Sequence, residues 1–344
     1  MLARPCSVLL SIVCLVNLAM SNSASAQEPA KIKVGMIGLD TSHVVAFTSA
    51  LKKENAAPEL KAIEIIAGFP GGSPDIPDSA NRVEKFTEQL RGMGVEIVES
   101  IDDLLTKVDA VLLESVDGRP HLAQARPVIK AGKPLFIDKP IAGTLADAIE
   151  IFELAKEAKV PLFSSSSLRF SPGIIGMRND PKVGAVKGCD TYGPCSLEPH
   201  HPDLFWYGVH GCEMLFTVMG TGCTQVTRVH TPDTDLVVGT WKDNRVGTFR
   251  GARGYKAGYG GMVFGDAGAA PTGSYAGYEP LLVEIAKFFQ TKQPPVSAEE
   301  TIELFAFMEA ADESKRQSGA AVTIESVLTK ARAQVAERRS GAKP

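Results

Sequence analysis

Histidines and acids gather in one stretch of the sequence, between residues 198 and 213. Three of the six histidines, His200, His201 and His210, fall within eleven residues. His210 and Glu213 are spaced i, i+3, so one face of a helix can present both side chains. Imidazole and carboxylate groups together suit zinc or another divalent ion that keeps an open catalytic position. One interpretation of the pattern is a metal site formed by His201, His210 and Glu213.

A polar sugar-binding loop is the alternative interpretation of this stretch, and a purely structural role is the third. Adjacent histidines in an extended segment point in different directions, which weakens the metal interpretation. In the sugar-binding interpretation, polar side chains in and near the stretch contact the substrate. These side chains are Arg169, Tyr192, His200, His201, Asp203 and Glu213.

A second charged group follows a short apolar run at residues 135–137. Asp138-Lys139-Pro140 is the charged exit from this run, which has the composition of a buried strand. Residues 117–121 leave another apolar run in the same way. In a doubly wound sheet, ligands bind at the carboxyl ends of the strands. We therefore expect Asp138 and Lys139 at a ligand site.

The turn at residues 38–43 has part of a phosphate-binding pattern. A dinucleotide fingerprint, G-x-G-x-x-G, lets backbone amides approach a pyrophosphate at a helix N-terminus. The chain reads G-L-D-T-S-H, so Gly38 fits the first position while Asp40 and His43 replace the later glycines. One interpretation is that Gly38, Asp40, Ser42 and His43 contact a cofactor. The other is that Asp40 or Ser42 caps the helix that follows.

The elements that must position these residues alternate between strands and helices in the first half of the chain. The sequence predicts strands over residues 31–38, 63–67, 110–114, 135–137 and 162–165, and helices over 42–53, 122–131 and 144–158. Such alternation indicates a parallel sheet with right-handed crossovers. We therefore expect a doubly wound, Rossmann-like α/β domain over residues 27–168.

The second half of the chain has a different pattern of predicted strands and helices. Short, turn-separated segments at residues 226–230, 235–241 and 245–250 suit an antiparallel sheet, and amphipathic helices return at 278–290 and 298–317. We expect an α+β domain with a mostly antiparallel sheet over residues 169–344.

The charged exit and its surroundings carry a family resemblance. From His121 the chain reads H-x9-A-G-K-x4-D-K-P, which resembles the Gfo/Idh/MocA oxidoreductases; these carry E-K-P where this chain has D-K-P. Residues 167–172, S-L-R-F-S-P, look like the R-F-x-P segment of the family. Residues 206–213, W-Y-G-V-H-G-C-E, resemble its D-x-G-x-H-x-x-D signature, with Trp206 in place of the first aspartate.

The resemblance implies an oxidoreductase that acts on a sugar or sugar derivative with NAD or NADP. Lys139 and His210 would then handle the substrate proton, and Asp138 and Lys139 would lie beside the cofactor. It also implies a homo-oligomer. A non-redox carbohydrate lyase or hydrolase, with or without a metal ion such as zinc, is the alternative function. A non-catalytic carbohydrate-binding protein is the third.

One geometric expectation is common to these functions. Lys139 and His210 should face a single inter-domain cleft, because the second domain must cover the ligand edge of the sheet. A small sugar bridging both groups limits their separation to about 12 Å. A lysine beside His210 would also lower the pKa of that histidine. The other residues expected in the cleft are Asp40 or His43, Arg169, Tyr192 and His201.

The charge balance excludes one class of partner. The chain has 36 lysines and arginines against 40 acids, a net charge of −4. A strongly basic face is therefore not expected, which argues against nucleic-acid binding. The expected partner is a small-molecule or oligomeric carbohydrate substrate.

The first 26 residues have the pattern of a signal peptide. Arg4 precedes an apolar run over residues 8–20, and Ala24-Ser25-Ala26 supplies small residues for cleavage before Gln27. We expect export by the general secretory route to the periplasm or the exterior. No later apolar run has the length of a membrane span, so no membrane contact is expected after cleavage.

Four cysteines remain after the predicted cleavage: Cys189, Cys195, Cys212 and Cys223. An even number in an oxidising compartment is compatible with one or two disulfides. Buried free thiols are the equal alternative.

Overall fold

A computed structural model of the protein describes residues 1–2 and 30–341. The predicted cleavage site and nearly all of the predicted signal peptide lie outside the described residues. Among the residues that are described, no helix is both long and apolar enough to cross a membrane.

The first sheet contains six strands, all parallel, and holds the ligand edge. Its order is β3-β2-β1-β4-β5-β6, the order of a dinucleotide-binding Rossmann sheet. The topology reverses between β1 and β4, so the crevice for a ligand opens between their carboxyl ends. The strands are β1 (Ile32–Ile37), β2 (Ile63–Phe69), β3 (Glu96–Ile97), β4 (Ala110–Leu113), β5 (Leu135–Asp138) and β6 (Leu162–Ser165).

Helices cover both faces of this sheet, which is why β4, β5 and β6 are buried along their whole length. One face packs against α1 (Ser42–Leu51), α3 (Val83–Gly92) and α9 (Glu279–Thr291). The other packs against α4 (Ile101–Lys107), α5 (His121–Lys130) and α6 (Leu145–Ala158).

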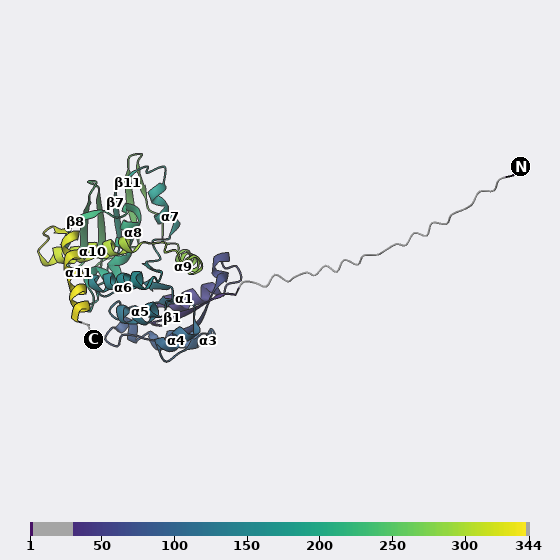
Figure 1. Ribbon diagram of the computed structural model, residues 1–344. Coiled ribbons are helices and arrows are strands. Elements are labelled where there is room, and N and C mark those ends of the chain that lie inside the picture. The colour runs from purple at the N-terminus through teal and green to yellow at the C-terminus, as the bar shows by residue number, and fades with distance from the viewer. Residues whose placement is uncertain (3–29, 342–344) are drawn as a thin grey trace. The chain divides into compact units, whose positions relative to one another are not determined.

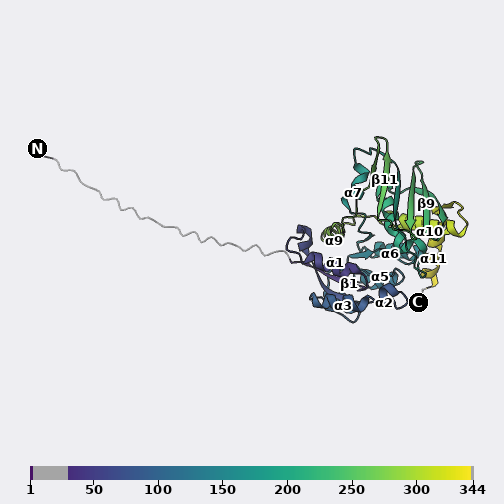
Figure 2. The ribbon, with the colours of Figure 1, turned by 180° about the vertical axis from the view of Figure 1, so that it is seen from behind.

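Helix α9 comes from the C-terminal half of the chain yet belongs to the core of the first sheet. It lies beside α1 in both views of the ribbon (Figures 1 and 2). The ring centroids of Phe288 from α9 and Phe163 from β6 are 4.9 Å apart. The two halves of the chain therefore share buried apolar surface.

The second sheet contains seven strands in the order β12-β11-β7-β10-β9-β8-β13. Only the β7–β10 pair is parallel among its described pairings. The strands are β7 (Val186–Pro194), β8 (Cys223–His230), β9 (Thr234–Trp241), β10 (Val246–Ala252), β11 (Gly260–Gly265), β12 (Ala269–Pro271) and β13 (Val322–Thr323). Burial alternates strictly along β9, as expected when one face of a sheet is covered.

Helices α8 (Val209–Met219) and α10 (Ala298–Arg316) pack against this sheet, while α11 (Ile324–Gly341) returns to α6 (Figure 1). A π-helical turn over Leu204–Gly208 leads directly into α8. Short elements form several of the connections. They are the helices α2 (Pro77–Ala80) and α7 (Pro172–Ile175) and the 3₁₀ turns at Pro58–Ala62 and Gly176–Asn179.

The predicted fold class, a doubly wound parallel sheet followed by a mostly antiparallel one, is confirmed. The division at residue 168 stays a prediction. All four cysteines in the described part are buried free thiols, which decides between the two alternatives left open by the sequence.

Candidate functional site

A cavity of about 170 Å³ lies at the carboxyl edge of the parallel sheet, where α8 and the second sheet approach it. Lys139, directly after β5, and His210, the second residue of α8, both line this cavity. The rest of the wall is rich in aromatic side chains. They are Trp206, Tyr207, Tyr259, Tyr275 and Tyr278.

Lys139 and His210 both lie near one tyrosine, Tyr207. The Lys139 ammonium is 5.5 Å from the centroid of the Tyr207 ring. The same ring centroid is 5.8 Å from that of His210. The separation between the Lys139 ammonium and the His210 ring cannot exceed the sum of these two distances, which is below the limit of about 12 Å for two groups bridged by a small sugar.

His210 is held by the end of β6. Its Nδ1 lies 2.7 Å from the Ser166 hydroxyl, which also accepts a hydrogen bond from Leu168 N. Burial lowers the pKa of His210 well below its ordinary value, and the positive charge of Lys139 lowers it further. The imidazole is therefore neutral at pH 7 and can accept a proton. Burial also lowers the pKa of Lys139.

Arg169 and Glu213, both expected to bind substrate, pair with each other and do not line the cavity. Arg169 Nε donates to Glu213 Oε1 at 2.7 Å, and its Nη1 donates to Glu300 at 2.6 Å. Glu213 also accepts hydrogen bonds from Ser165 Oγ and Ser166 N. These bonds use both carboxylate oxygens, so Glu213 joins α8 to the end of β6 and positions Ser166 beneath His210.

The predicted metal set His201, His210 and Glu213 is not brought together, because each member has other partners. The fully buried side chain of His201 places Nε2 3.1 Å from Asp117 Oδ1 and 3.2 Å from Gly118 N. His201 also lies against Trp206, at a centroid distance of 4.9 Å. The Nε2 atom of His201 is therefore bonded to the loop after β4 and is not directed to a metal ion with His210 and Glu213.

The remaining substrate-binding candidates also lie away from the cavity wall. Asp203 accepts hydrogen bonds from Arg228 and Lys315. His200 is half-exposed and pairs with Glu198. Tyr192 is exposed on β7. The polar stretch is therefore mostly structural, with His210 the one member that reaches the cavity.

Several residues of the turn after β1 make contacts within the protein. Gly38 has φ +84°, and a Cβ there would lie 2.2 Å from Ser115 Oγ. Thr41, not Asp40 or Ser42, caps α1 by accepting from His43 N. Ser42 and His43 line the cavity.

Asp40 occupies the crevice at the topological switch point. It is fully buried, and its carboxylate accepts hydrogen bonds from Val116 N at 3.0 Å and Ser79 Oγ at 2.6 Å. Burial raises the pKa of Asp40, although both hydrogen bonds oppose that shift. In the fingerprint, a glycine at this position lets the pyrophosphate approach the backbone.

The segment between β2 and α3 covers this turn. Ile76 is fully buried in a small cluster with Val116 and Trp206. Ser73 is tied to Asp117 by a hydrogen bond of 2.5 Å, and its backbone N–H donates to Ser79. Trp206, which replaces the family aspartate, therefore packs against a segment folded over the phosphate turn. A pyrophosphate placed as in the ordinary Rossmann site would meet the Asp40 carboxylate beside this segment.

Sequence analysis missed one functional candidate, Glu114. It follows β4 directly and is completely buried. Its Oε2 lies 3.8 Å from His43 Nδ1, which in turn lies 2.7 Å from Asp138 Oδ2. The sequence does indicate this position, because Glu114 ends a predicted strand at the same edge of the sheet where Lys139 is expected.

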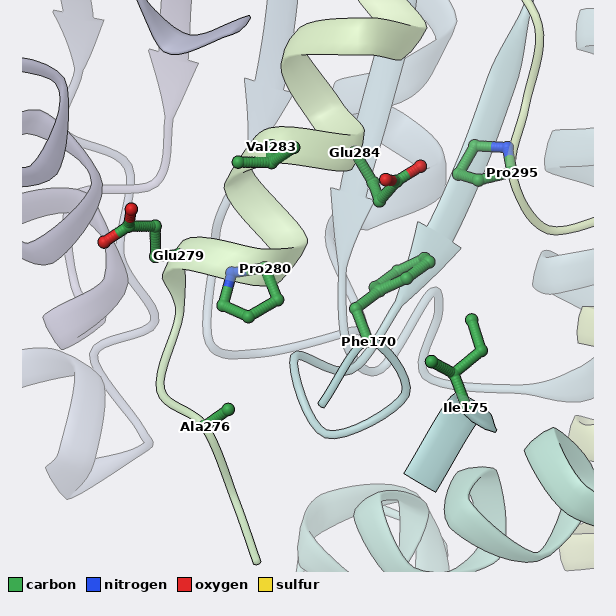
Figure 3. Close-up of a pocket in the computed structure, with 8 residues that line it drawn as sticks. All are labelled: Phe170, Ile175, Ala276, Glu279, Pro280, Val283, Glu284 and Pro295. Atoms are coloured by element: carbon green, nitrogen blue, oxygen red, sulfur yellow. The ribbon is translucent and has the colours of Figure 1, made fainter. Parts of the chain in front are cut away.

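A larger pocket of about 630 Å³ lies elsewhere, between the start of α9 and residues 170–175 (Figure 3). Phe170, Ile175 and Pro280 form much of its wall, and Glu279 and Glu284 supply its charges. None of the acid–base residues named above lines this pocket. The smaller cavity is therefore the candidate site, because Lys139 and His210 line it.

Comparison with known proteins agrees with this fold. The family model described as an oxidoreductase family with an NAD-binding Rossmann fold, Gfo/Idh/MocA, matches residues 32–166. Residues 32–166 belong to this family.

Curated relatives match over part of their length. An oxidoreductase of Streptococcus pneumoniae is 27% identical over 174 residues, which cover 47% of this chain and 44% of that protein. The 1,5-anhydro-D-fructose reductase of Ensifer adhaerens is 32% identical over 127 residues, or 36% of this chain and 37% of the reductase. The match therefore spans less than half of each relative.

Solved structures resemble most of the chain in fold. The scyllo-inositol dehydrogenase of Lactobacillus casei with NAD(H) and scyllo-inositol has a TM-score of 0.68 at 15% identity, covering 86% of this chain and 100% of that one. An oxidoreductase of Agrobacterium radiobacter with NAD⁺, L-tartaric acid and magnesium has a TM-score of 0.68 at 16% identity, covering 86% and 99%. At this identity the likeness concerns the fold.

Proposed function

We propose that this protein catalyses a non-redox proton-transfer reaction, an elimination or a hydrolysis, on a small polyhydroxylated substrate such as a sugar derivative. Lys139 and His210 are the proposed acid–base groups. The single observation that carries the proposal is the Asp40 carboxylate, which fills the phosphate turn while the acid–base groups of the family remain in one cavity.

The charges at the turn support the non-redox part of the proposal. A pyrophosphate would have to displace Asp40 from Val116 N and Ser79, and would then lie beside a buried carboxylate. Like charges in a desolvated site repel strongly. Ile76 and Trp206 would have to separate as well, at the cost of their buried apolar contact.

The cavity supports the substrate part of the proposal. It offers aromatic faces with polar ends, from Tyr207, Tyr259 and Tyr275, together with a basic amine and a neutral imidazole. Such groups suit the mixed apolar and hydroxyl surface of a sugar ring. The relatives named for an anhydro-sugar and an inositol act on molecules of this chemical class.

In this proposal His210 accepts a proton from the substrate and Lys139 stabilises or protonates the oxygen on which charge develops. Glu213 and Ser166 position the imidazole through the hydrogen bonds described above. The tyrosines reduce the access of water to both groups.

An NAD(P)-dependent dehydrogenase is the second candidate. The observation that favours it is the family match over residues 32–166, which includes the turn and the D-K-P exit. In that case Lys139 and His210 would act on the hydroxyl that loses hydride, and the segment over residues 70–79 would have to move.

Turnover of a panel of sugar derivatives, followed by mass spectrometry without and with added NAD(P), separates the two candidates. We expect conversion without a dinucleotide, at constant redox state, that falls at least about 100-fold in Lys139→Met and in His210→Gln. Lys133→Met, which changes a partly exposed lysine before the other end of β5, is the matched control. Conversion that requires NAD(P) would establish the dehydrogenase instead.

Ligand binding can be followed independently of turnover. The chain has two tryptophans, of which Trp206 lines the cavity and Trp241 is buried against Phe216. A sugar that fills the cavity should change the fluorescence of Trp206. Saturable binding of sugars in the absence of any turnover would support a carbohydrate-binding protein and contradict the proposed catalysis.

We also propose that the chain is exported and that the mature protein begins at Gln27. The proposal rests on the signal-like pattern of the sequence before that residue. N-terminal sequencing of the processed protein is the direct test.

A further inference from the structure

Three buried side chains that sequence analysis did not group converge at the wall of the cavity. His43 comes from the start of α1, Glu114 from the end of β4 and Asp138 from the end of β5. Their exposed fractions are 8%, 0% and 2%. One ligand atom from each lies within 4.8 Å of the other two. His43 also lines the cavity, so the cluster adjoins the proposed substrate.

The polar atoms of this cluster lack partners. Both oxygens of Glu114 and Oδ1 of Asp138 have no hydrogen bond. His43 Nδ1 lies 2.7 Å from Asp138 Oδ2 but without the geometry of a hydrogen bond. A buried carboxylate without a partner is costly, and a pair of them more so because they repel. The arrangement therefore calls for a positive charge between them.

His43 pairs with Asp138, and the other neighbouring protein cations leave both Glu114 oxygens without a donor. Lys139 is close enough to influence both carboxylates, yet its ammonium faces the Tyr207 ring and leaves the Glu114 oxygens without a donor. Arg119, the next cation after β4, is taken by Asp75 and Asp117. The ligand atoms of His43, Glu114 and Asp138 instead lie within 4.8 Å of one another.

We propose that His43, Glu114 and Asp138 bind a divalent transition-metal ion, of the class of Zn²⁺ or Mn²⁺. One imidazole and two carboxylates are suitable ligands for such ions, and three protein ligands leave open positions for water or substrate. This site differs from the metal set expected from the sequence, and it does not depend on the proposed function, because the ion can be measured without any substrate.

The spacing of the ligand atoms suits an ion of this size. Ligand atoms about 2.1 Å from a tetrahedral ion are about 3.4 Å apart. The observed separation between His43 Nδ1 and Glu114 Oε2 is 3.8 Å, and the 2.7 Å pair of His43 and Asp138 would need to open by less than about 1 Å. Side-chain rotation alone provides a movement of that size.

A bound ion would also explain why His43 replaces the third glycine of the fingerprint. The imidazole adjoins two carboxylates here, whereas a glycine would leave both of them without a ligand partner. In the cavity, the ion would act as a Lewis acid toward a substrate oxygen.

The test is metal content and metal titration of the full chain. Elemental analysis of purified protein, loaded with Zn²⁺ or Mn²⁺ and then dialysed, should give about one ion per chain. Calorimetric titration should show that Glu114→Gln, which keeps the shape but removes the charge, weakens binding at least about 100-fold. Glu303→Gln is the matched control, because Glu303 accepts hydrogen bonds from Gly222 N and Cys223 N away from the cavity.

Two results would overturn the proposal. One is a wild-type protein that takes up neither ion at millimolar concentration. The other is unchanged affinity in a folded Glu114→Gln variant. If that variant does not fold, the visible absorption of the Co²⁺-loaded wild type keeps the proposal testable: we expect the intense bands of a low-coordinate site, and the weak spectrum of hydrated Co²⁺ would contradict it.

Discussion

The Asp40 carboxylate links the ends of the two strands that flank the switch point, since it follows β1 and accepts a 3.0 Å hydrogen bond from Val116 N after β4. Its other oxygen accepts from Ser79 Oγ, in the segment that covers the turn. The protein's own carboxylate and backbone are therefore hydrogen-bonded to each other at the crevice that receives a phosphate in other doubly wound sheets.

Removing this link should loosen the covering segment. In Asp40→Ala, Val116 N and Ser79 Oγ lose their acceptor inside the protein, so the free energy of unfolding should fall by about 1–3 kcal/mol. Asp40→Asn retains an acceptor for Val116 and should lose less. Urea denaturation gives the values, and hydrogen exchange over residues 73–80 should accelerate in the alanine variant. Exchange that does not change there would contradict this role.

The pair of Arg169 and Glu213 should matter for stability more than a second arginine nearby. Both side chains are buried, so Arg169→Met leaves the Glu213 charge without its cation and should cost roughly 3–5 kcal/mol. Arg178 contacts the same Glu300 from a side chain that is 39% exposed. Arg178→Met should therefore cost about 1 kcal/mol or less. Equal losses in the two variants, measured by urea denaturation, would show that Glu213 is not the partner that matters.

Acid should weaken the loop after β4 through Asp117. Burial would raise the pKa of Asp117, but hydrogen bonds from His201, Arg119 and Ser73 hold it well below its ordinary value. A depressed pKa in the folded state stabilises the fold above the ordinary pKa near 4, and this contribution disappears as the pH falls.

Asp117→Asn should therefore lose more stability at pH 7 than at pH 3. Thermal unfolding of both proteins at the two pH values measures the difference. Asp75→Asn, which removes the exposed partner of Arg119, is the control and should show a smaller pH dependence. A stability difference for Asp117→Asn that is the same at both pH values would refute the assignment.

The cysteines should be unreactive in the folded protein. Burial raises the pKa of Cys189, Cys195 and Cys223 to about 12 and that of Cys212 well above its ordinary value. Thiolates are the reactive form, so Ellman's reagent should find almost none at pH 8. After denaturation of a chain that starts at Gln27, four thiols should react. A smaller number would indicate a disulfide.

The fold could be predicted from the sequence because its signals are local. The apolar run at residues 110–114 and the helix at 144–158 carry their own periodicity, and the alternation of such elements indicates a parallel sheet. Elements with weaker patterns were missed, among them β3, with two residues, and β7. The contribution of α9 to the first core could not be seen, because no local pattern says which sheet a helix will cover.

The candidate site was harder to predict because partners come from distant parts of the chain. His201 meets Asp117, 84 residues before it, and Glu213 meets Arg169. Spacing along the sequence favoured both as ligands, but each is taken by a partner that only folding brings close. Lys139 lay within reach of sequence analysis because it directly follows a strand at the ligand edge.

Titration of the wild-type protein with NAD⁺ and NADP⁺, followed by calorimetry, tests the central claim most directly. Asp40 and the residues packed over it should prevent binding, so we predict no saturable heat for either dinucleotide at millimolar concentration. Asp40→Gly, which restores the glycine of the fingerprint, is the informative comparison. Saturable binding to the wild type, with a dissociation constant in the micromolar range, would contradict the claim that this phosphate turn is closed.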